Sequence, residues 1–235
     1  MVADLIPAEA EGRCAARFGV FGDGDDASRD GGRYRQTLLV SEVDRNALAA
    51  ALASPCSAVV EELDGDDPAG DWTAVAVPAT GFYLSLSTGT SFGVQVASLV
   101  SEALMARGII GEERRSVIEL CLQEAVANAI IHGNLGISST AKDHPEGYRV
   151  FSQLVTERLA DPALRRRRVD LFARWAGRTL DISVVDQGVG FDQSAIRSEV
   201  GGSARSGRGF VFMRALAARV DLSDGGRCTS LRFEL

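Results

Sequence analysis

The sequence predicts an α+β fold, and three observations predict it. Residues 112–134 have the apolar periodicity of a long helix that is buried over most of its surface. Two later segments, 169–175 and 179–185, alternate like strands around a short AGR turn, which is typical of a hairpin. The chain of 235 residues has no internal repeat and is long enough for one large domain, or for one domain with a smaller unit.

Composition and charge argue against two functions: nucleic acid binding, and phosphate binding by a GxxxxGK[ST] loop. The net charge of −7 is uneven, because the first 80 residues hold 15 acidic and only 6 basic side chains. Nucleic acid binding needs a concentrated basic surface, so the sequence predicts no nucleic acid partner. Lys142 is the single lysine and does not lie in a GxxxxGK[ST] loop, which excludes that phosphate-binding motif.

The expected location is the cytoplasm. The first residues, MVADLIPAEAEGR, lack a basic start followed by an apolar run, and no window approaches the roughly 20 apolar residues that a membrane span needs. The sequence therefore predicts no membrane association. Four cysteines lie in separate segments without CxxC spacing, which is typical of reduced, buried thiols.

The first 80 residues are predicted to precede the main domain. Residues 1–34 are rich in Gly, Asp, Ala and Arg and predict an irregular segment. Residues 35–80 predict a small α/β unit of unknown role, with strands at 36–41, 57–63 and 73–77. Ser41 with Asp44 is expected to cap a helix that runs to Ala53.

Residues 81–235 are predicted to form the main domain, which begins after the PATG turn. A strand at 82–86 and one amphipathic helix at 89–106 precede the long helix. A polar, partly helical insertion at about 136–168 separates that helix from the hairpin. A helix at 209–219, with Met213 and Leu216 in the core, and a last strand pair complete the domain.

The long helix carries polar side chains where a buried helix should be apolar. Glu124, Asn128 and His132 recur at a spacing of four, so they form a single stripe along the helix. Burying such groups unpaired costs a few kcal/mol each. The stripe is expected to line a cleft. The alternative is a solvent-exposed face, but the alanines between the three polar residues favour close packing.

One glycine-containing segment follows a predicted strand, and a second one begins a predicted helix. The segment DQGVGFD begins with Asp186 at the end of a strand, and an aspartate there can accept a hydrogen bond from the exocyclic amine of a purine. Its glycines allow the backbone to approach a flat ligand. The segment SGRGF opens a helix, whose free N–H groups and positive end favour a phosphate.

Together, EAVANAIIHG on a helix, DxGxGFD after a strand and GRGxxxMRxL opening a helix resemble the GHKL or Bergerat-fold ATPases. Within that family the sequence is most similar to the bacterial anti-sigma-factor serine kinases. The resemblance covers residues 82–235 apart from the insertion. It implies a Bergerat-type α/β sandwich, in which helices cover one face of a mixed, mostly antiparallel sheet.

The resemblance implies roles for the matching residues, with ATP and Mg²⁺ as cofactors. Asn128 is similar to the asparagine whose oxygen holds Mg²⁺, and Glu124 is similar to the general base. His132 is expected either to orient phosphates or to support the helix end. The remaining implied roles are adenine binding by Asp186, the turn beneath the base at Gly188 and Gly190, phosphate contact at Gly207 and Gly209, charge neutralisation by Arg208, and closure of the adenine site by Thr229.

The sequence departs from the family pattern in two places. About thirty residues separate the long helix from the next strand, and the unit at 35–80 is additional. The insertion ends in Arg165–Arg168. Such a run is usually a solvated face, but it could also meet an acidic partner or the acidic N-terminal unit.

The function that these observations favour is an ATP- and Mg²⁺-dependent serine/threonine protein kinase, with a sigma factor or an anti-sigma antagonist as partner. A homodimer is compatible with this prediction. The alternative is a non-catalytic or slow-turnover nucleotide-binding module that sequesters a regulatory partner. A histidine kinase is disfavoured because no histidine precedes His132. A DNA-topology or repair ATPase is disfavoured by the acidic charge.

Overall fold

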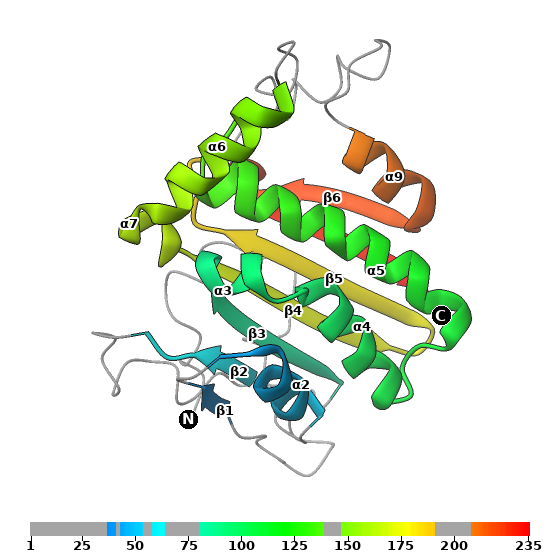
Figure 1. The fold of residues 1–235 in the computed structure, drawn as a ribbon. Coiled ribbons are helices and arrows are strands. Elements are labelled where there is room, and N and C mark those ends of the chain that lie inside the picture. The colour runs from blue at the N-terminus through cyan, green and yellow to red at the C-terminus, as the bar shows by residue number, and fades with distance from the viewer. Residues whose placement is uncertain (1–36, 41–42, 54–57, 64–79, 139–146, 191–207) are drawn as a thin grey trace, which may run out of the picture.

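The computed structural model describes residues 37–40, 43–53, 58–63, 80–138, 147–190 and 208–235. The predicted irregular segment at 1–34, the third N-terminal strand at 73–77 and residue Gly207 lie outside these ranges. Element labels follow Figure 1.

One seven-stranded sheet forms the centre of the fold, in the order β1-β2-β3-β4-β5-β7-β6. The first three strands pair in parallel, and the remaining neighbours pair antiparallel. The sheet is therefore mixed and mostly antiparallel, and the predicted α+β fold class is confirmed. The strands are β1 (Thr37–Val40), β2 (Ala58–Glu61), β3 (Gly81–Ser87), β4 (Arg168–Ala176), β5 (Thr179–Asp186), β6 (Arg219–Ser223) and β7 (Cys228–Glu234).

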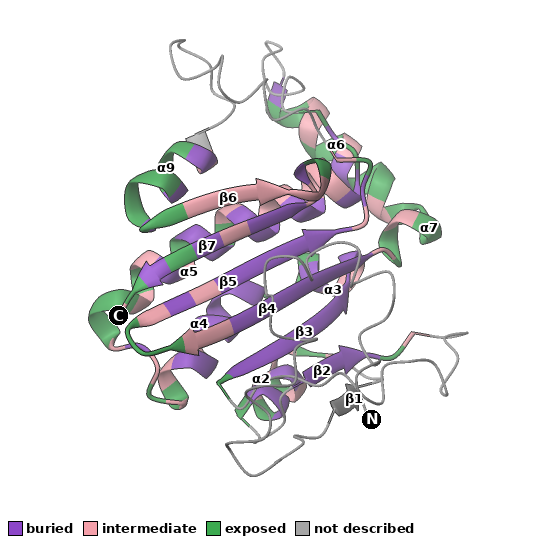
Figure 2. Cartoon of the chain, turned by 180° about the vertical axis from the view of Figure 1, so that it is seen from behind, coloured by how far each residue is buried: buried purple, intermediate pink, exposed green. Residues whose placement is uncertain are grey.

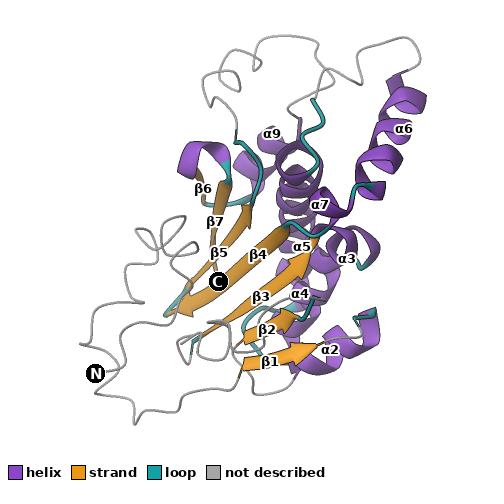
Figure 3. Ribbon diagram, turned by 90° about the vertical axis from the view of Figure 1, so that its left-hand side faces the viewer, coloured by secondary structure: helices purple, strands orange, loops and turns teal. Residues whose placement is uncertain are grey.

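The helices form a second layer on one face of the sheet, as Figures 1 and 3 show. The helices are α2 (Arg45–Ala53), α3 (Thr88–Gly93), α4 (Val96–Ala106), α5 (Glu112–Ala127), the π-helix η2 (Asn128–Asn134), α6 (Gly147–Ala160), α7 (Pro162–Arg165), α9 (Arg208–Leu216) and the 3₁₀ turn η5 (Asp224–Gly226). The main core lies between the two layers, where Leu99, Leu122 and Ile182 are almost completely buried.

The central strands are buried on both faces. Every residue of β3 is buried, and burial continues through most of β4 and β5 (Figure 2). A second apolar cluster lies on the face away from the helices and includes Tyr83, Phe172 and Val185. The small polar residues Ser85 and Ser183 are buried among the apolar residues of β3 and β5, so these strands keep an alternating pattern although both faces are covered.

The segment predicted as a small N-terminal unit extends the same sheet. Strand β2 pairs with β3, and α2 packs on α4 through the buried Leu48 and Leu52. Asp44 caps α2 by accepting from the N–H of Ala47 at 2.8 Å. Buried Arg168 donates from Nη1 to the carbonyl of Glu61 at 2.7 Å. This arginine of the basic run therefore contacts the N-terminal segment, whereas Arg165 is exposed.

The single helix predicted at 89–106 is two helices. The helix α3 ends at Gly93, and Val94 has extended backbone angles, with φ −106 and ψ 124. Phe92, expected on the apolar side of one long helix, is consequently 51% exposed. The prediction was wrong because a glycine and an extended residue restart the helix and rotate its second part.

Two smaller expectations of burial are also wrong. Helix α9 ends at Leu216, and Arg219 already belongs to β6, so Leu216 remains 37% exposed while Met213 is fully buried. The long helix was predicted to be buried over most of its surface, but Leu120 on α5 is 38% exposed, because α4, α9 and β7 pack on other sides of the helix. Apolar periodicity identified both helices but not the width of their buried faces.

The cysteines differ from one another. Cys121 is a free, buried thiol, as predicted. Cys228 is disulfide-bonded, so the prediction of reduced thiols is wrong at this position. Sequence spacing does not reveal which cysteines meet in space. Within the described ranges, no helix is both long and apolar enough to cross a membrane.

Candidate functional site

Glu124 lies on α5, where the start of α9 approaches it. A Cβ added to Gly209 would overlap Oε2 of Glu124, so the carboxylate lies directly against the first turn of α9. Glu124 is half-buried rather than solvent-exposed. The structure therefore brings together two residues that are far apart in the sequence and that the resemblance places at the terminal phosphates.

Asn128 lies one turn further on, where α5 becomes the π-helix η2. Its backbone N–H still donates to the carbonyls of Glu124 and Ala125. Its side-chain Nδ2 is buried and has no hydrogen-bond partner in the described part of the chain. Because an unpaired buried amide costs about 1–3 kcal/mol, this side chain is poorly explained as a purely structural residue.

The π-helix alters the predicted stripe of polar side chains. Leu135 donates its N–H to the carbonyl of Ile130 at 2.8 Å, five residues back, so the helix is wider here. Residues four apart do not lie directly above one another in a π-helix, so the side chains of His132 and Asn128 do not point in the same direction. The Nδ1 of His132 lies 2.6 Å from the carbonyl oxygen of Ile137, which is the contact expected of a histidine that supports the helix end.

Asp186 ends β5 and is 95% buried, with 5% of its surface exposed. Its Oδ1 accepts from the N–H of Gly188 at 2.8 Å, which closes a tight turn after the strand. A Cβ on Gly133 would overlap its carboxyl group. The end of η2 and the end of β5 are therefore in direct contact, and the carboxylate faces the helix layer.

The two glycines after Asp186 are required by packing between protein segments. A Cβ on Gly188 would overlap the carbonyl of Gly133, and a Cβ on Gly190 would overlap the carbonyl of Gly225. Gly190 also has φ +76, which favours glycine. The sequence explained these glycines by the approach of a flat ligand, whereas the structure adds backbone-to-backbone contact as a reason.

Thr229 lies on β7 directly opposite Val184 of β5. Residues opposite each other share a face of the sheet, as do residues two apart on one strand. Thr229 therefore lies on the same face as Asp186, and it is buried. Arg208 begins α9, but its side chain, like all of Gly207, lies outside the described residues.

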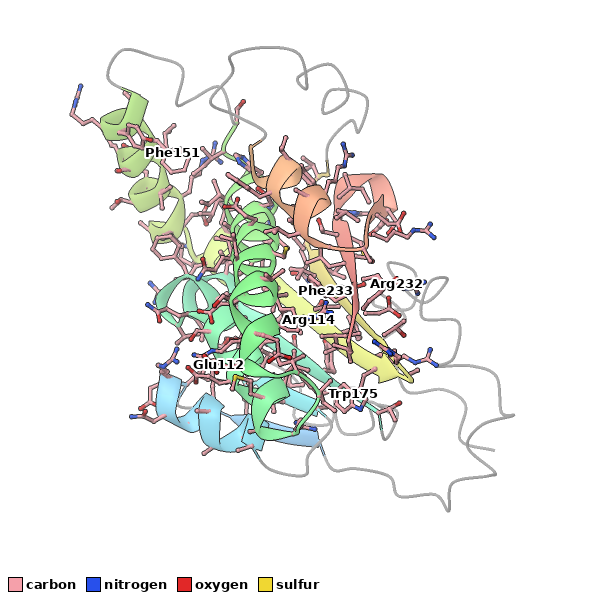
Figure 4. The ribbon with its side chains drawn as sticks, turned by 90° about the vertical axis from the view of Figure 1, so that its right-hand side faces the viewer. Glu112, Arg114, Phe151, Trp175, Arg232 and Phe233 are labelled. Atoms are coloured by element: carbon pink, nitrogen blue, oxygen red, sulfur yellow. The ribbon has the colours of Figure 1, made fainter. Side chains whose placement is uncertain are left out.

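Two cavities lie away from these residues. A groove of ≈ 500 Å³ runs between the α3–α4 junction and α5, and its lining includes Glu119, Gln123 and Ala127. A smaller cavity of ≈ 220 Å³ is lined by residues that include Arg114 and Phe233, which Figure 4 labels. Neither lining contains Glu124 or Asn128, so the acid and the amide lie on another side of α5.

Cys121 reports on the electrostatics beside Glu124. Burial and, secondly, the negative charge of Glu124 raise the pKa of the Cys121 thiol to about 11. We expect the Cys121 thiol to remain mostly protonated from roughly pH 8 to 10, where an ordinary thiol with a pKa of about 8.5 already ionises. Glu124→Gln should lower this pKa, measured by the pH dependence of the Cys121 Cβ chemical shift in ¹³C NMR. An unchanged titration would contradict the coupling.

The polar groups fit a magnesium nucleotide better than a transition metal. In the described ranges there is no cluster of three or more His, Cys, Asp or Glu side chains that could hold a metal by themselves. Magnesium is usually held by one or two oxygen ligands together with phosphate oxygens. The Oδ1 of Asn128 is an oxygen ligand of the kind that Mg²⁺ prefers, whereas its buried Nδ2, which has no partner in the described residues, can only donate a hydrogen bond.

Gly133 and Asn134 contribute to this site, but the sequence interpretation gave them no role. They follow His132, where a glycine and an asparagine read simply as the end of a helix. In the structure, Gly133 permits the approach of Asp186, and Asn134 is fully buried. The sequence signal for their role was the presence of a second asparagine, Asn134, directly after His132 and Gly133.

A buried aspartate at the end of β5 therefore lies beside the helix that carries a half-buried carboxylate and a buried amide. Residues 93–234 match the family model described as a histidine kinase-like ATPase domain. The match covers more than half of the chain, so the chain belongs to this family of ATP-binding, kinase-like ATPases. A comparison with curated proteins gave no match.

Proposed function

We propose that this protein is an ATP- and Mg²⁺-dependent serine/threonine protein kinase of the anti-sigma-factor type. Its proposed partner is a sigma factor or an anti-sigma antagonist in bacterial signal transduction. The observation that carries the proposal is the position of the Glu124 carboxylate against Gly209 at the start of α9. This contact supports a role for Glu124 as the base, because the resemblance assigns phosphate contact to Gly209.

Each site residue would have a separate role in this reaction. Asp186 binds the exocyclic amine of adenine, and Thr229 closes the same side of the base. Asn128 holds Mg²⁺, which neutralises charge on the triphosphate when it is bound. Glu124 accepts the proton of the attacking hydroxyl. The N–H groups at the start of α9 face the phosphates.

The proposed location is the cytoplasm. The reduced thiol of Cys121 suits that compartment, whereas the disulfide at Cys228 does not.

The α/β segment before residue 80 and the insertion are proposed as the places where this chain differs from a minimal kinase domain in its contacts with partners.

The test combines nucleotide binding with phosphate transfer. Pure protein is titrated with ATP by calorimetry and then incubated with γ-labelled ATP, Mg²⁺ and candidate sigma factors or antagonists. We expect transfer to a partner as an acid-stable phosphoester, since phosphohistidine would be lost in acid. No ATP or ADP binding at millimolar ligand would overturn the proposal.

Asp186→Asn supplies the binding variant for this test. It keeps the shape of the side chain but removes the charge, and a hydrogen bond to a charged group contributes about 1.5–3 kcal/mol. ATP affinity should fall about 10- to 100-fold. Asp181→Asn is the matched control, because Asp181 lies on the same strand and pairs with Arg232 at 2.6 Å. The control should bind ATP normally.

A further inference from the structure

Asn134 is an unusually well-connected buried side chain at the end of η2. It is completely buried, and its Nδ2 donates to Thr88 Oγ1 at 2.8 Å and to the carbonyl of Arg168 at 2.9 Å. Its Oδ1 accepts from the N–H of Gln187 at 2.7 Å. A backbone N–H can only donate and a carbonyl can only accept, so these contacts fix the orientation of the amide.

These three hydrogen bonds join three separate segments. Thr88 begins α3, Arg168 begins β4, and Gln187 lies between Asp186 and Gly188. The side chain of Gln187 adds a fourth contact, because its Oε1 accepts from the N–H of Arg168 at 2.8 Å. The residue that follows Asp186 is therefore held by both its backbone and its side chain.

The turn that contains Gln187 also sets the direction of Asp186. The Asp186 carboxylate accepts from Gly188 within this turn, and it lies against Gly133, the residue before Asn134. A displacement of Gln187 would move both contacts. The hydrogen bond between Asn134 and Gln187 links the end of η2 to this turn.

We propose that Asn134 is a positioning residue that holds the Asp186–Gly188 turn in the orientation required for adenine recognition. The inference rests on the proposed role of Asp186 in binding the exocyclic amine of adenine. Asn134 supports that recognition through Gln187 and makes no contact with the nucleotide.

The hydrogen bonds around Asn134 extend to residues that precede the family match at 93–234. Arg168 donates to the carbonyl of Glu61, and the Glu61 carboxylate accepts from Ser87 Oγ at 3.1 Å and Thr90 Oγ1 at 2.6 Å. Ser87 and Thr90 flank Thr88, the first partner of Asn134. Strand β2 is thereby connected through buried hydrogen bonds to the residues that hold the adenine-binding turn.

The experiment compares two ligands on one protein, ADP and inosine diphosphate, which lacks the exocyclic amine. The wild type should prefer ADP, and Asn134→Ala should reduce the ADP-to-inosine-diphosphate affinity ratio about tenfold. The affinity for inosine diphosphate should change much less. A general loss of folded protein would weaken both ligands equally and leave the ratio unchanged. Affinities are measured by calorimetry, with thermal midpoints recorded for each variant.

Two further variants complete the test. Thr88→Val keeps the side-chain shape but removes one partner of Asn134, and it should lower the ratio about threefold even if Asn134→Ala does not fold. Ser183→Ala is the matched control, because it removes a partly buried 2.6 Å hydrogen bond to Ser230 from the opposite face of β5. It should leave the ratio unchanged.

The outcomes separate the two hypotheses. A wild type that binds both diphosphates equally would overturn the proposed role of Asp186 in adenine recognition, and the positioning role would fall with it. A wild type that prefers ADP, together with folded Asn134→Ala or Thr88→Val proteins that keep the full preference, would overturn the positioning role of Asn134 alone.

Discussion

Glu124→Gln should bind ATP almost as tightly as the wild type and transfer phosphate about 10² to 10⁴ times more slowly, because a positioned general base contributes a factor of that size. Glutamine has nearly the same shape, so the contact with Gly209 is preserved. The loss should therefore appear in the rate of transfer and not in the dissociation constant. The measurement is single-turnover transfer from γ-labelled ATP, beside calorimetric titration of the same samples.

Glu119→Gln is the control for this variant. Glu119 lies on the same helix but pairs with Arg115 at 3.6 Å and accepts from Ser101 at 3.0 Å. Its substitution should leave transfer unchanged. Normal transfer by Glu124→Gln would show that Glu124 is not the base. Tight ATP binding by the wild type without any transfer would favour a nucleotide-binding module that sequesters its partner.

Asn128→Ala should lose Mg²⁺-dependent nucleotide binding. Even supporting residues around a metal contribute 10- to 100-fold in affinity, so the loss of a direct ligand should cost about 100-fold or more. The remaining affinity should be the same with Mg²⁺ and with a chelator. Calorimetric titrations with ATP under both conditions measure the difference, and affinity that still depends on Mg²⁺ would contradict the role of Asn128.

The stability of the same variant provides an independent check. Since Nδ2 of Asn128 is buried without a partner in the described residues, its removal should leave the thermal midpoint of the free protein unchanged or higher. Gln123→Ala is the control, because Gln123 also carries an amide on α5 but lines the groove beside α4. It should retain Mg²⁺-dependent binding. A large fall in the midpoint of Asn128→Ala would indicate a structural asparagine.

Several parts of the site could be predicted because they depend on short stretches of sequence. The apolar period of residues 112–134 predicted the helix that the structure divides into α5 and η2, and the spacing of Glu124 and Asn128 placed them on one side of it. Alternation predicted β4 and β5, so Asp186 was correctly placed at a strand end. Each of these predictions uses residues that are neighbours along the chain.

Other features required contacts between distant segments. Residues 89–106 have one continuous apolar pattern, yet the packing of α3 and α4 divides them at Val94. The strand at 58–61 was recognised, but its addition to the edge of β3 depends on pairing across the sheet. The π-helical geometry of η2 could not be predicted, because α-helical and π-helical turns bury similar patterns of apolar residues.

By itself, the sequence determined the long helix, strands β3, β4 and β5 and the chemical identity of the groups at the site, because helix and strand periodicities arise from neighbouring residues. The tertiary structure alone decided that Asn134 bonds to Gln187, 53 residues away, and that Gly188 packs against Gly133. Such contacts depend on how the sheet and helix layers meet. A buried amide therefore acquires its role only when the folded chain supplies, or withholds, its hydrogen-bond partners.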